Sequence, residues 1–408
     1  MSVRVLSAPW IFTGADPVEL RARALKDAAV ALAGDVVVAV GPRDEVVSRF
    51  GPAEHLDAVL FPALVNAHTH LELSHLHGHV PGGEGLPGWV RLLLSTRANH
   101  PDPGYAIRHA VLSMQELGVA AVGDVSNTLA TVAHLNEVGV VGTVFHEVFG
   151  FSRRRIETML EQARTLAAAA PAPGPGLRVV LSPHAVYSTH PEVLAKLLRA
   201  GPASIHLAED PAERRFCAEG GGPFAGLTHA LTAIDLAPFA RSAVAAAAPH
   251  LHAGSLAVHV VDLDEEDLAA LAATGATAVL CPRSNRHIGG RLADLPRLLA
   301  AGIPLAVGTD SLASSPSLSP LAELATLRAA YPDVSAARLL PLAWAGGAVG
   351  APAVGRIAVG GAPGIVAAPL GGERPDDAAE WLVSGFGAEE RRVHWIARHW
   401  PELPREAA

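Results

Sequence analysis

Two histidines one residue apart, His68 and His70, follow an apolar run that reads LFPALVNA. In a strand, residues i and i+2 point to the same side, so both imidazoles would face one way at the end of that strand. Two imidazoles held in this way form half of a metal site. The pair alone is a weak signal, because His75, His77 and His79 follow closely and such spacings arise by chance.

Later segments supply the donors that such a site would still lack. They are His206, Glu209, His259 and Asp310, with a further histidine at His184. Three neutral imidazoles and one carboxylate suit Zn²⁺, with Fe²⁺ as the second choice. Such a metal lowers the pKa of a bound water toward about 7. Glu209 is then placed to carry protons, Asp310 to bind the metal and accept a proton, and His259 to orient the water.

Each of these residues has a simpler interpretation when it is taken alone. A histidine at a strand end is more often a hydrogen-bonded polar residue than a ligand, which applies to His184 and His259. Asp310 after Gly-Thr could cap a turn, and Glu209 before Asp-Pro is typical of a helix start. The metal site is favoured because separate segments, in order along the chain, each end with a residue type that it needs.

The elements that must position these residues alternate from about residue 60 to residue 350. The apolar runs are 60–66, 119–124, 140–148, 177–182, 203–207, 256–261, 276–281 and 304–308. Helices are expected over 105–117, 155–169, 191–199, 265–273, 292–301 and 321–330. Apolar strands separated by helices indicate a parallel sheet buried on both faces, and eight such units indicate an α/β fold of the (β/α)8 TIM barrel type. A doubly wound sheet is the alternative, but no G-x-G-x-x-G sequence follows any run.

The two ends of the chain have a different pattern. Short β-like runs at 3–6 and 36–40 and a turn-rich ribbon over 355–370 predict a small β-sandwich. We therefore expect residues 1–58 and 351–408 to form one composite β domain and residues 59–350 to form the barrel. The tail from Asp376 is expected to be partly helical.

Composition excludes several classes of function. Apolar residues make up 50% of the 408 residues and charged residues 17%, which is typical of a folded protein. The net charge of −9 argues against nucleic-acid binding. Without a secretory signal or an apolar run of about 18 residues, a cytoplasmic protein that does not enter membranes is expected. Cys217 and Cys281 are expected to be free thiols.

The ordered motifs resemble the amidohydrolase superfamily, and within it the cytosine-deaminase-like branch. The segments that carry the resemblance are PALVNAHTH over 62–70, PHAVYS over 183–188, HLAE over 206–209, VHV over 258–260, CPRSN over 281–285 and VGTDS over 307–311. The resemblance implies the metal ligands His68, His70, His206 and Asp310. It also implies Glu209 as proton shuttle and His259 as a second base or water-orienting residue.

The same resemblance implies a substrate pocket. Its expected lining residues are His184, Arg283, Asn285 and Arg286, with Glu84 and Trp89 matching more loosely. A single metal is expected, because neither Lys26 nor Lys196 is placed to bridge two metals.

Members of the branch with His-x-x-Glu typically deaminate purine or pyrimidine rings. The implied reaction is attack of metal-activated water on the amino-bearing ring carbon, protonation of the adjacent ring nitrogen by Glu209, and loss of ammonia. Aminodeoxyfutalosine, an intermediate of menaquinone biosynthesis, is the first expectation, because Arg283 or Arg286 could meet its benzoate bidentately.

Other functions stay open on the sequence. The alternatives are adenosylhomocysteine or methylthioadenosine deamination and a guanine- or triazine-type hydrolase. The alternative of another class is a non-catalytic metal-binding scaffold, which the complete ligand set disfavours. The expected partner is a small-molecule substrate, and a homodimer is the oligomer considered.

Overall fold

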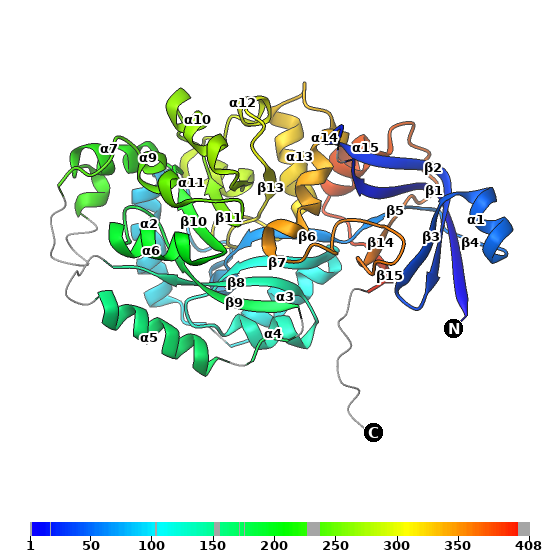
Figure 1. Cartoon of the computed structure of the whole chain (residues 1–408), viewed down its shortest axis with the longest axis horizontal. Coiled ribbons are helices and arrows are strands. Elements are labelled where there is room, and N and C mark those ends of the chain that lie inside the picture. Colours follow the sequence, from blue (N-terminus) through cyan, green and yellow to red (C-terminus); the bar gives the residue numbers. More distant parts are fainter. Residues whose placement is uncertain are drawn as a thin grey trace.

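Eight parallel strands form the centre of the computed structural model, which describes residues 2–398 except 17, 103, 151–155, 171, 175 and 227–236 (Figure 1). They lie in two sheets of order β6-β7-β8-β9 and β10-β11-β12-β13. Their bounds are β6 Leu64–Thr69, β7 Val119–Val125, β8 Val141–Val148, β9 Leu177–Pro183, β10 Ala203–Leu207, β11 Ser255–His259, β12 Thr277–Leu280 and β13 Leu305–Val307. A bridge from Ala185 to His206 and another from Thr69 to Asp310 join the sheets at both edges, as a (β/α)8 barrel requires.

Helices connect successive strands and cover the outside of the barrel (Figure 1). They are α2 Gly85–Asn99, α3 Ala106–Glu116, α4 Thr131–Glu137, α5 Ile156–Ala169, α6 Pro191–Ala200, α7 Pro211–Glu219, α9 Ala243–Ala247, α10 Glu265–Thr274, α11 Pro282–Gly289, α12 Leu295–Ala300, α13 Pro320–Ala330 and α14 Ala336–Leu339. Shorter turns are η1 Leu71–Leu76, η3 Ala248–His250, η4 Leu340–Trp344 and η5 Gly346–Val349. Asp210 starts α7 with a capping box to Glu213, and Asp264 caps α10, so these polar residues fix where the helices begin.

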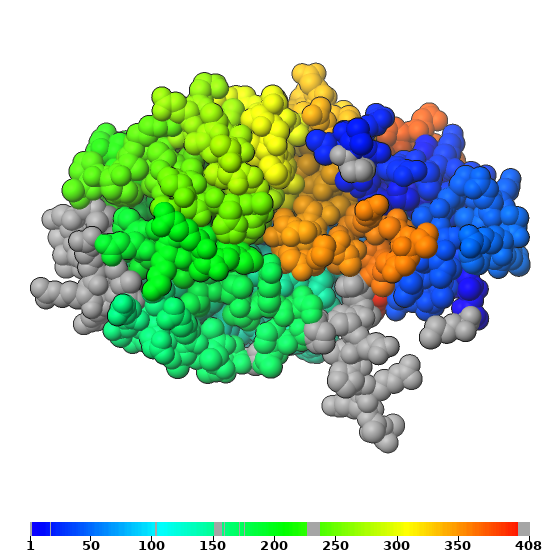
Figure 2. Space-filling view, viewed as in Figure 1, coloured from blue at the N-terminus to red at the C-terminus, as the bar shows by residue number. Residues whose placement is uncertain are grey.

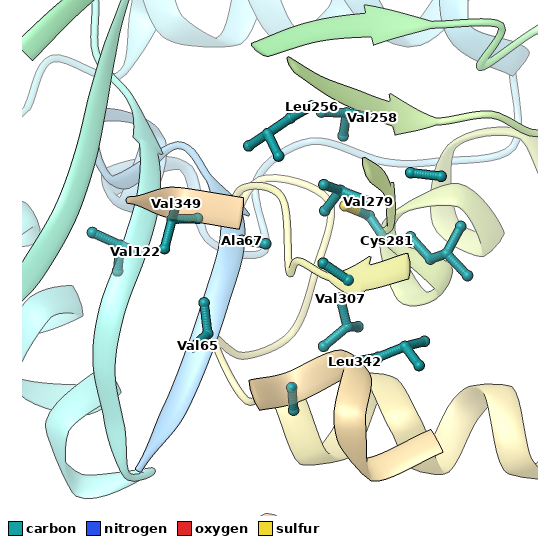
Figure 3. Close-up of a cluster of buried hydrophobic side chains, with 14 of the residues drawn as sticks. Val65, Ala67, Val122, Leu256, Val258, Val279, Cys281, Val307, Leu342 and Val349 are labelled. Carbon is teal, nitrogen blue, oxygen red and sulfur yellow. The ribbon is translucent and has the colours of Figure 1, made fainter. Parts of the chain in front are cut away.

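One apolar cluster joins the two sheets. The buried residues labelled in Figure 3 are Val65, Ala67, Val122, Leu256, Val258, Val279, Cys281, Val307, Leu342 and Val349. Apart from Cys281, which lies between β12 and α11, they come from strands of both sheets and from η4 and η5, so the sheets share one core (Figure 3). Removing this surface from water favours the closed arrangement. Cys281 is one of two free, buried thiols, and Cys217 is the other, as expected.

Both ends of the chain build a second sheet beside the barrel. It has seven strands of order β15-β14-β5-β1-β2-β3, with β4 paired to β1. The strands are β1 Val3–Ala15, β2 Ala22–Ala33, β3 Val36–Pro42, β4 Glu54–His55, β5 Ala58–Pro62, β14 Ile365–Pro369 and β15 His394–Ala397, with helix α1 Arg43–Phe50 after β3. Figure 2 shows the blue N-terminal and orange C-terminal segments packed together at one end of the molecule.

The first apolar run belongs to two sheets rather than one. Its residues up to Pro62 lie in β5, which pairs with β1 and β14, whereas Leu64 begins the barrel strand β6. The tail after Asp376 is partly helical, with α15 Ala378–Glu380 and a π-helical segment Trp381–Gly387 before β15, and residues 399–408 lie outside the described residues. Among the helices of the described chain, none has the length and apolar character needed to cross a membrane.

Candidate active site

The four predicted metal ligands, His68, His70, His206 and Asp310, lie close together at one end of the barrel. His70 Nε2 lies 3.2 Å from His68 Nε2 and 3.1 Å from His206 Nε2. Asp310 Oδ1 lies 3.4 Å from His70 Nε2 and 3.8 Å from His68 Nε2. In a tetrahedral site with metal–nitrogen distances of about 2.0–2.1 Å, two ligand nitrogens lie about 3.3 Å apart. The spacings of His68, His206 and Asp310 from His70 therefore suit ligands of one divalent ion.

Strand ends hold these ligands in place. His68 lies in β6 and His206 in β10, while Asp310 follows β13. The backbone N–H groups of Thr309 and Asp310 both donate to the His68 carbonyl at 3.0 Å, which ties the two ligand-bearing segments together. The Asn66 side chain donates to the Thr309 hydroxyl at 2.7 Å and accepts from the Thr309 N–H at 3.1 Å, which fixes the same junction.

Burial keeps the three predicted histidine ligands neutral. Desolvation lowers the pKa of His70 to about 3 and also lowers the pKa values of His68 and His206. Neutral imidazole is the form that binds a metal. His206 Nδ1 donates to the His184 carbonyl at 3.1 Å, so its Nε2 is left free to act as the ligand atom.

Asp310 is held as a carboxylate. Burial acts to raise its pKa, but the nearby imidazoles of His70 and His259 and a hydrogen bond from Ser284 lower the pKa overall. The Ser284 hydroxyl donates to Asp310 Oδ2 at 2.6 Å, which leaves Oδ1 directed toward the histidines. A carboxylate with one oxygen anchored and one free suits a metal ligand that also accepts a proton.

Backbone strain marks the same strand ends. Ala208, His259 and Asp310 have φ angles of 52°, 78° and 56°, in the left-handed region that residues other than glycine rarely adopt. Each such residue costs about 1–3 kcal/mol and persists where the surrounding structure imposes it, which is common at functional sites. Ala208 directly follows β10, His259 is the last residue of β11, and Asp310 lies three residues after β13.

Glu209 and His259 face one space beside the ligands. His259 Nε2 lies 3.4 Å from Glu209 Oε2. Within the described residues, neither His259 Nε2 nor Glu209 Oε1 has a hydrogen-bond partner, although both atoms are buried. Burial raises the pKa of the Glu209 carboxyl well above its usual value, which suits a group that holds and releases a proton. Unpartnered buried polar atoms are rare in folded proteins, so the pair indicates a place for reacting molecules.

The donor set, the neutral imidazoles and these unpartnered atoms fit a divalent metal. When bound, such an ion would act as a Lewis acid and lower the pKa of a water molecule. A family model described as the amidohydrolase family matches residues 59–375, which is more than half of the chain. The chain belongs to the amidohydrolase family.

Comparison with known proteins places this amidohydrolase among deaminases. It is 31% identical over 370 residues to the aminodeoxyfutalosine deaminase of Deinococcus radiodurans, covering 84% of each chain. It is also 31% identical over 364 residues to a 5-methylthioadenosine/S-adenosylhomocysteine deaminase of Nitratidesulfovibrio vulgaris, covering 82% of this chain and 78% of that one. The family and these relatives identify the chain as a hydrolytic deaminase.

A solved structure shows the same fold. Helicobacter pylori aminofutalosine deaminase in complex with methylthio-coformycin superimposes with a TM-score of 0.81 at 23% identity, covering 96% of this chain and 97% of that one. The expected α/β barrel with its flanking β structure is therefore confirmed.

A cavity of about 490 Å³ opens over the site of the amidohydrolase. Its lining includes the predicted ligands His70, His206 and Asp310 and the predicted pocket residues Trp89 and His184. A groove of about 810 Å³ also runs along α5, but its lining contains none of the site residues, so the smaller cavity is the candidate active site.

Sequence reasoning missed the acidic wall of this cavity. Glu147, at the end of β8, lies with Oε1 3.5 Å from His206 Nδ1, and its Oε2 accepts from the Asn127 amide at 3.2 Å. A carboxylate near the end of the apolar run 140–148 was the signal that could have identified it, because Glu209 and Asp310, which follow the runs 203–207 and 304–308, were interpreted in that way.

The structure does not bring Glu84, Arg283 or Arg286 to the cavity. Glu84 and Arg286 are exposed, and none of the three is among the described lining residues. The Arg283 guanidinium donates to Ser317 Oγ at 2.9 Å and to Glu390 Oε1 at 2.7 Å.

The physical reason that Arg283 and Arg286 stay outside the cavity is the orientation of α11, whose buried face carries other residues of the same motif. Those buried residues are Pro282, Ser284, Asn285 and Ile288. Asn285 contacts His259 rather than the cavity.

Proposed function

We propose that this deaminase removes the 6-amino group of aminodeoxyfutalosine, with zinc as its metal, and so serves menaquinone biosynthesis. The observation that carries the proposal is that Glu209 and His259 lie close together in the wall of the cavity that the His–Asp donor set also lines. The aminodeoxyfutalosine deaminase of Deinococcus radiodurans, at 31% identity over most of both chains, supports this choice of substrate.

The residues of the chain divide the chemistry among them. His68, His70, His206 and Asp310 would hold the metal. The Glu209 carboxyl passes one proton of the attacking water to the ring nitrogen next to the reacting carbon. Asp310 passes the other proton to the amino group, which leaves as ammonia. The water oxygen stays on the ring carbon, so atoms and protons balance.

His259 orients the attacking water. The Asn285 amide nitrogen lies 3.0 Å from His259 Nδ1. Because an amide NH₂ can only donate, Nδ1 accepts and the neutral ring carries its proton on Nε2, which faces Glu209. Burial lowers the pKa of His259 to about 3, so the ring stays neutral at pH 7 and acts as a hydrogen-bond donor from Nε2.

The second candidate is a methylthioadenosine/adenosylhomocysteine deaminase, because the Nitratidesulfovibrio vulgaris relative is also 31% identical. The test is ammonia release by zinc-loaded protein given aminodeoxyfutalosine, adenosylhomocysteine, methylthioadenosine, adenosine and guanine side by side. The proposal predicts the highest kcat/KM for aminodeoxyfutalosine. A higher kcat/KM for adenosylhomocysteine or methylthioadenosine would favour the second candidate. If the protein binds one zinc but releases no ammonia from any of the five compounds, both candidates are overturned.

A further inference from the structure

One face of α2 forms a wall of the active-site cavity. The lining residues that it contributes are Leu86, Trp89, Val90, Leu93, Leu94 and Arg97. Their spacing of three and four residues places them on one side of a helix. The wall is therefore an apolar stripe that ends in a single guanidinium.

Arg97 brings a positive charge to a cavity wall whose other ionisable side chains are carboxylic acids, histidines and a tyrosine. Among the described residues of the cavity wall it is the one lysine or arginine, whereas the acidic groups are Glu72, Glu147, Glu209 and Asp310. Those carboxylates are buried, but Arg97 is exposed, and within the described part of the chain no hydrogen bond or ion pair engages it. Its guanidinium is thus available to a ligand.

The stripe runs from the reacting end of the cavity toward its mouth. The Leu86 N–H donates at 3.1 Å to a carboxylate oxygen of Asp210, the residue after Glu209. Arg97 lies eleven residues further along α2, which corresponds to about 16 Å at 1.5 Å per residue. The apolar side chains of Leu94 and Phe149, 46% and 58% exposed, also line the cavity. A purine at Glu209 would therefore extend its 5′ arm over apolar surface before it met Arg97.

We propose that Arg97 determines substrate specificity by pairing with a carboxylate at the far end of the 5′ arm of the nucleoside. This inference rests on the proposed function. A guanidinium binds a carboxylate through two parallel hydrogen bonds, so it selects an arm that ends in this group. The apolar walls near Arg97 suit a flat aromatic acid such as a benzoate. The α2 residues and Phe149 that form these walls include no carboxylate, so they could not pair with the ammonium group of an arm that ends in an amino acid.

The test compares two substrates on three variants. Ammonia release is measured with aminodeoxyfutalosine, whose arm ends in a carboxylate, and with methylthioadenosine, whose arm is uncharged. Arg97→Ala is expected to lower kcat/KM for aminodeoxyfutalosine by at least about 10-fold, mainly through KM, because a charge-assisted pair is lost. The same variant should leave kcat/KM for methylthioadenosine within about twofold of its starting value. Arg97→Lys, which keeps the positive charge, should have a kcat/KM for aminodeoxyfutalosine between those of Arg97→Ala and the unmodified protein.

Arg91→Ala is the matched control, because Arg91 is exposed on the same helix but does not line the cavity. It should behave as the unmodified protein with both substrates. If Arg97→Ala leaves aminodeoxyfutalosine turnover unchanged, or impairs both substrates equally, the role of Arg97 is overturned while the proposed function stands. If the unmodified protein does not act on aminodeoxyfutalosine, the proposed function fails, and the assignment of Arg97 fails with it.

Discussion

The Asn285 amide holds the His259 ring from behind, with Asn285 Nδ2 3.0 Å from His259 Nδ1. Both side chains are buried, and the opposite ring nitrogen faces Glu209. Asn285 thus positions His259 and sets which nitrogen carries the proton, although it does not itself line the cavity.

Replacing Asn285 by Ala should lower kcat by about 10-fold to 100-fold, the usual effect of removing a group that orients a site residue. KM and metal content should change little, because the ligand atoms are untouched. Arg286→Ala, an exposed neighbour on α11, is the control. Steady-state ammonia release with metal analysis checks the prediction, and a parallel loss of metal would show that Asn285 acts through the metal site instead.

Metal removal should inactivate the enzyme reversibly. Chelation should abolish ammonia release, and added zinc should restore it, because donor atoms of His68, His206 and Asp310 all lie within 3.4 Å of His70 Nε2. Zinc should also raise the melting temperature, since a ligand that binds only the folded state stabilises it. His206→Ala should lose this thermal response together with activity. A variant that kept its zinc response would remove His206 from the ligand set.

Acid should weaken the ion-pair cluster in which Asp264, the N-cap of α10, meets Arg214 of α7 and Arg241, which precedes α9. Asp264 accepts from Arg214 at 2.8 Å and from Arg241 at 2.7 Å, and the hydrogen bond from Arg241 is the main reason that its pKa lies below the usual value. A pKa lowered by folding contributes stability above the unfolded value of about 3.9, and that contribution is lost as pH falls through the folded pKa.

Asp264→Asn keeps the helix cap but removes the charge. We expect it to lower the free energy of unfolding at pH 7 by no more than about 1 kcal/mol, because Asp264 is partly exposed. The difference should shrink below about pH 4, because the Asp264 carboxyl of the unfolded chain takes up a proton there while that of the folded protein is still charged. Urea unfolding at several pH values measures both effects, with the exposed Asp333→Asn as control. A difference that grew in acid would contradict this sign.

The proximity of the predicted ligands could be foreseen because strand ends of a parallel barrel meet at one edge. Donor types at the ends of separate runs therefore indicated proximity, and the structure places His68, His206 and Asp310 each beside His70. The direction in which each side chain of the short helix α11 points was not predictable in the same way. The Arg283 guanidinium points away from the cavity to Ser317 and Glu390, while Ser284, Asn285 and Ile288 of the same helix are buried.

Two further features needed the tertiary structure. The run 60–66 is apolar throughout because its two halves are buried in different sheets, so no local signal marked the division at Ala63. Arg97 ends a stripe whose spacing is that of any amphipathic helix, and only the cavity shows that this face of α2 lies against open space.

The most direct test of the hydrolytic site is single-turnover ammonia release by the zinc-loaded Glu209→Gln variant. We expect unchanged zinc content and a rate at least about 100-fold below that of the unmodified enzyme, because the amide cannot pass the proton to the ring nitrogen. Glu219→Gln, an exposed carboxylate at the end of α7, should keep the full rate. A near-normal rate in Glu209→Gln with zinc bound would contradict the central role given to this carboxyl.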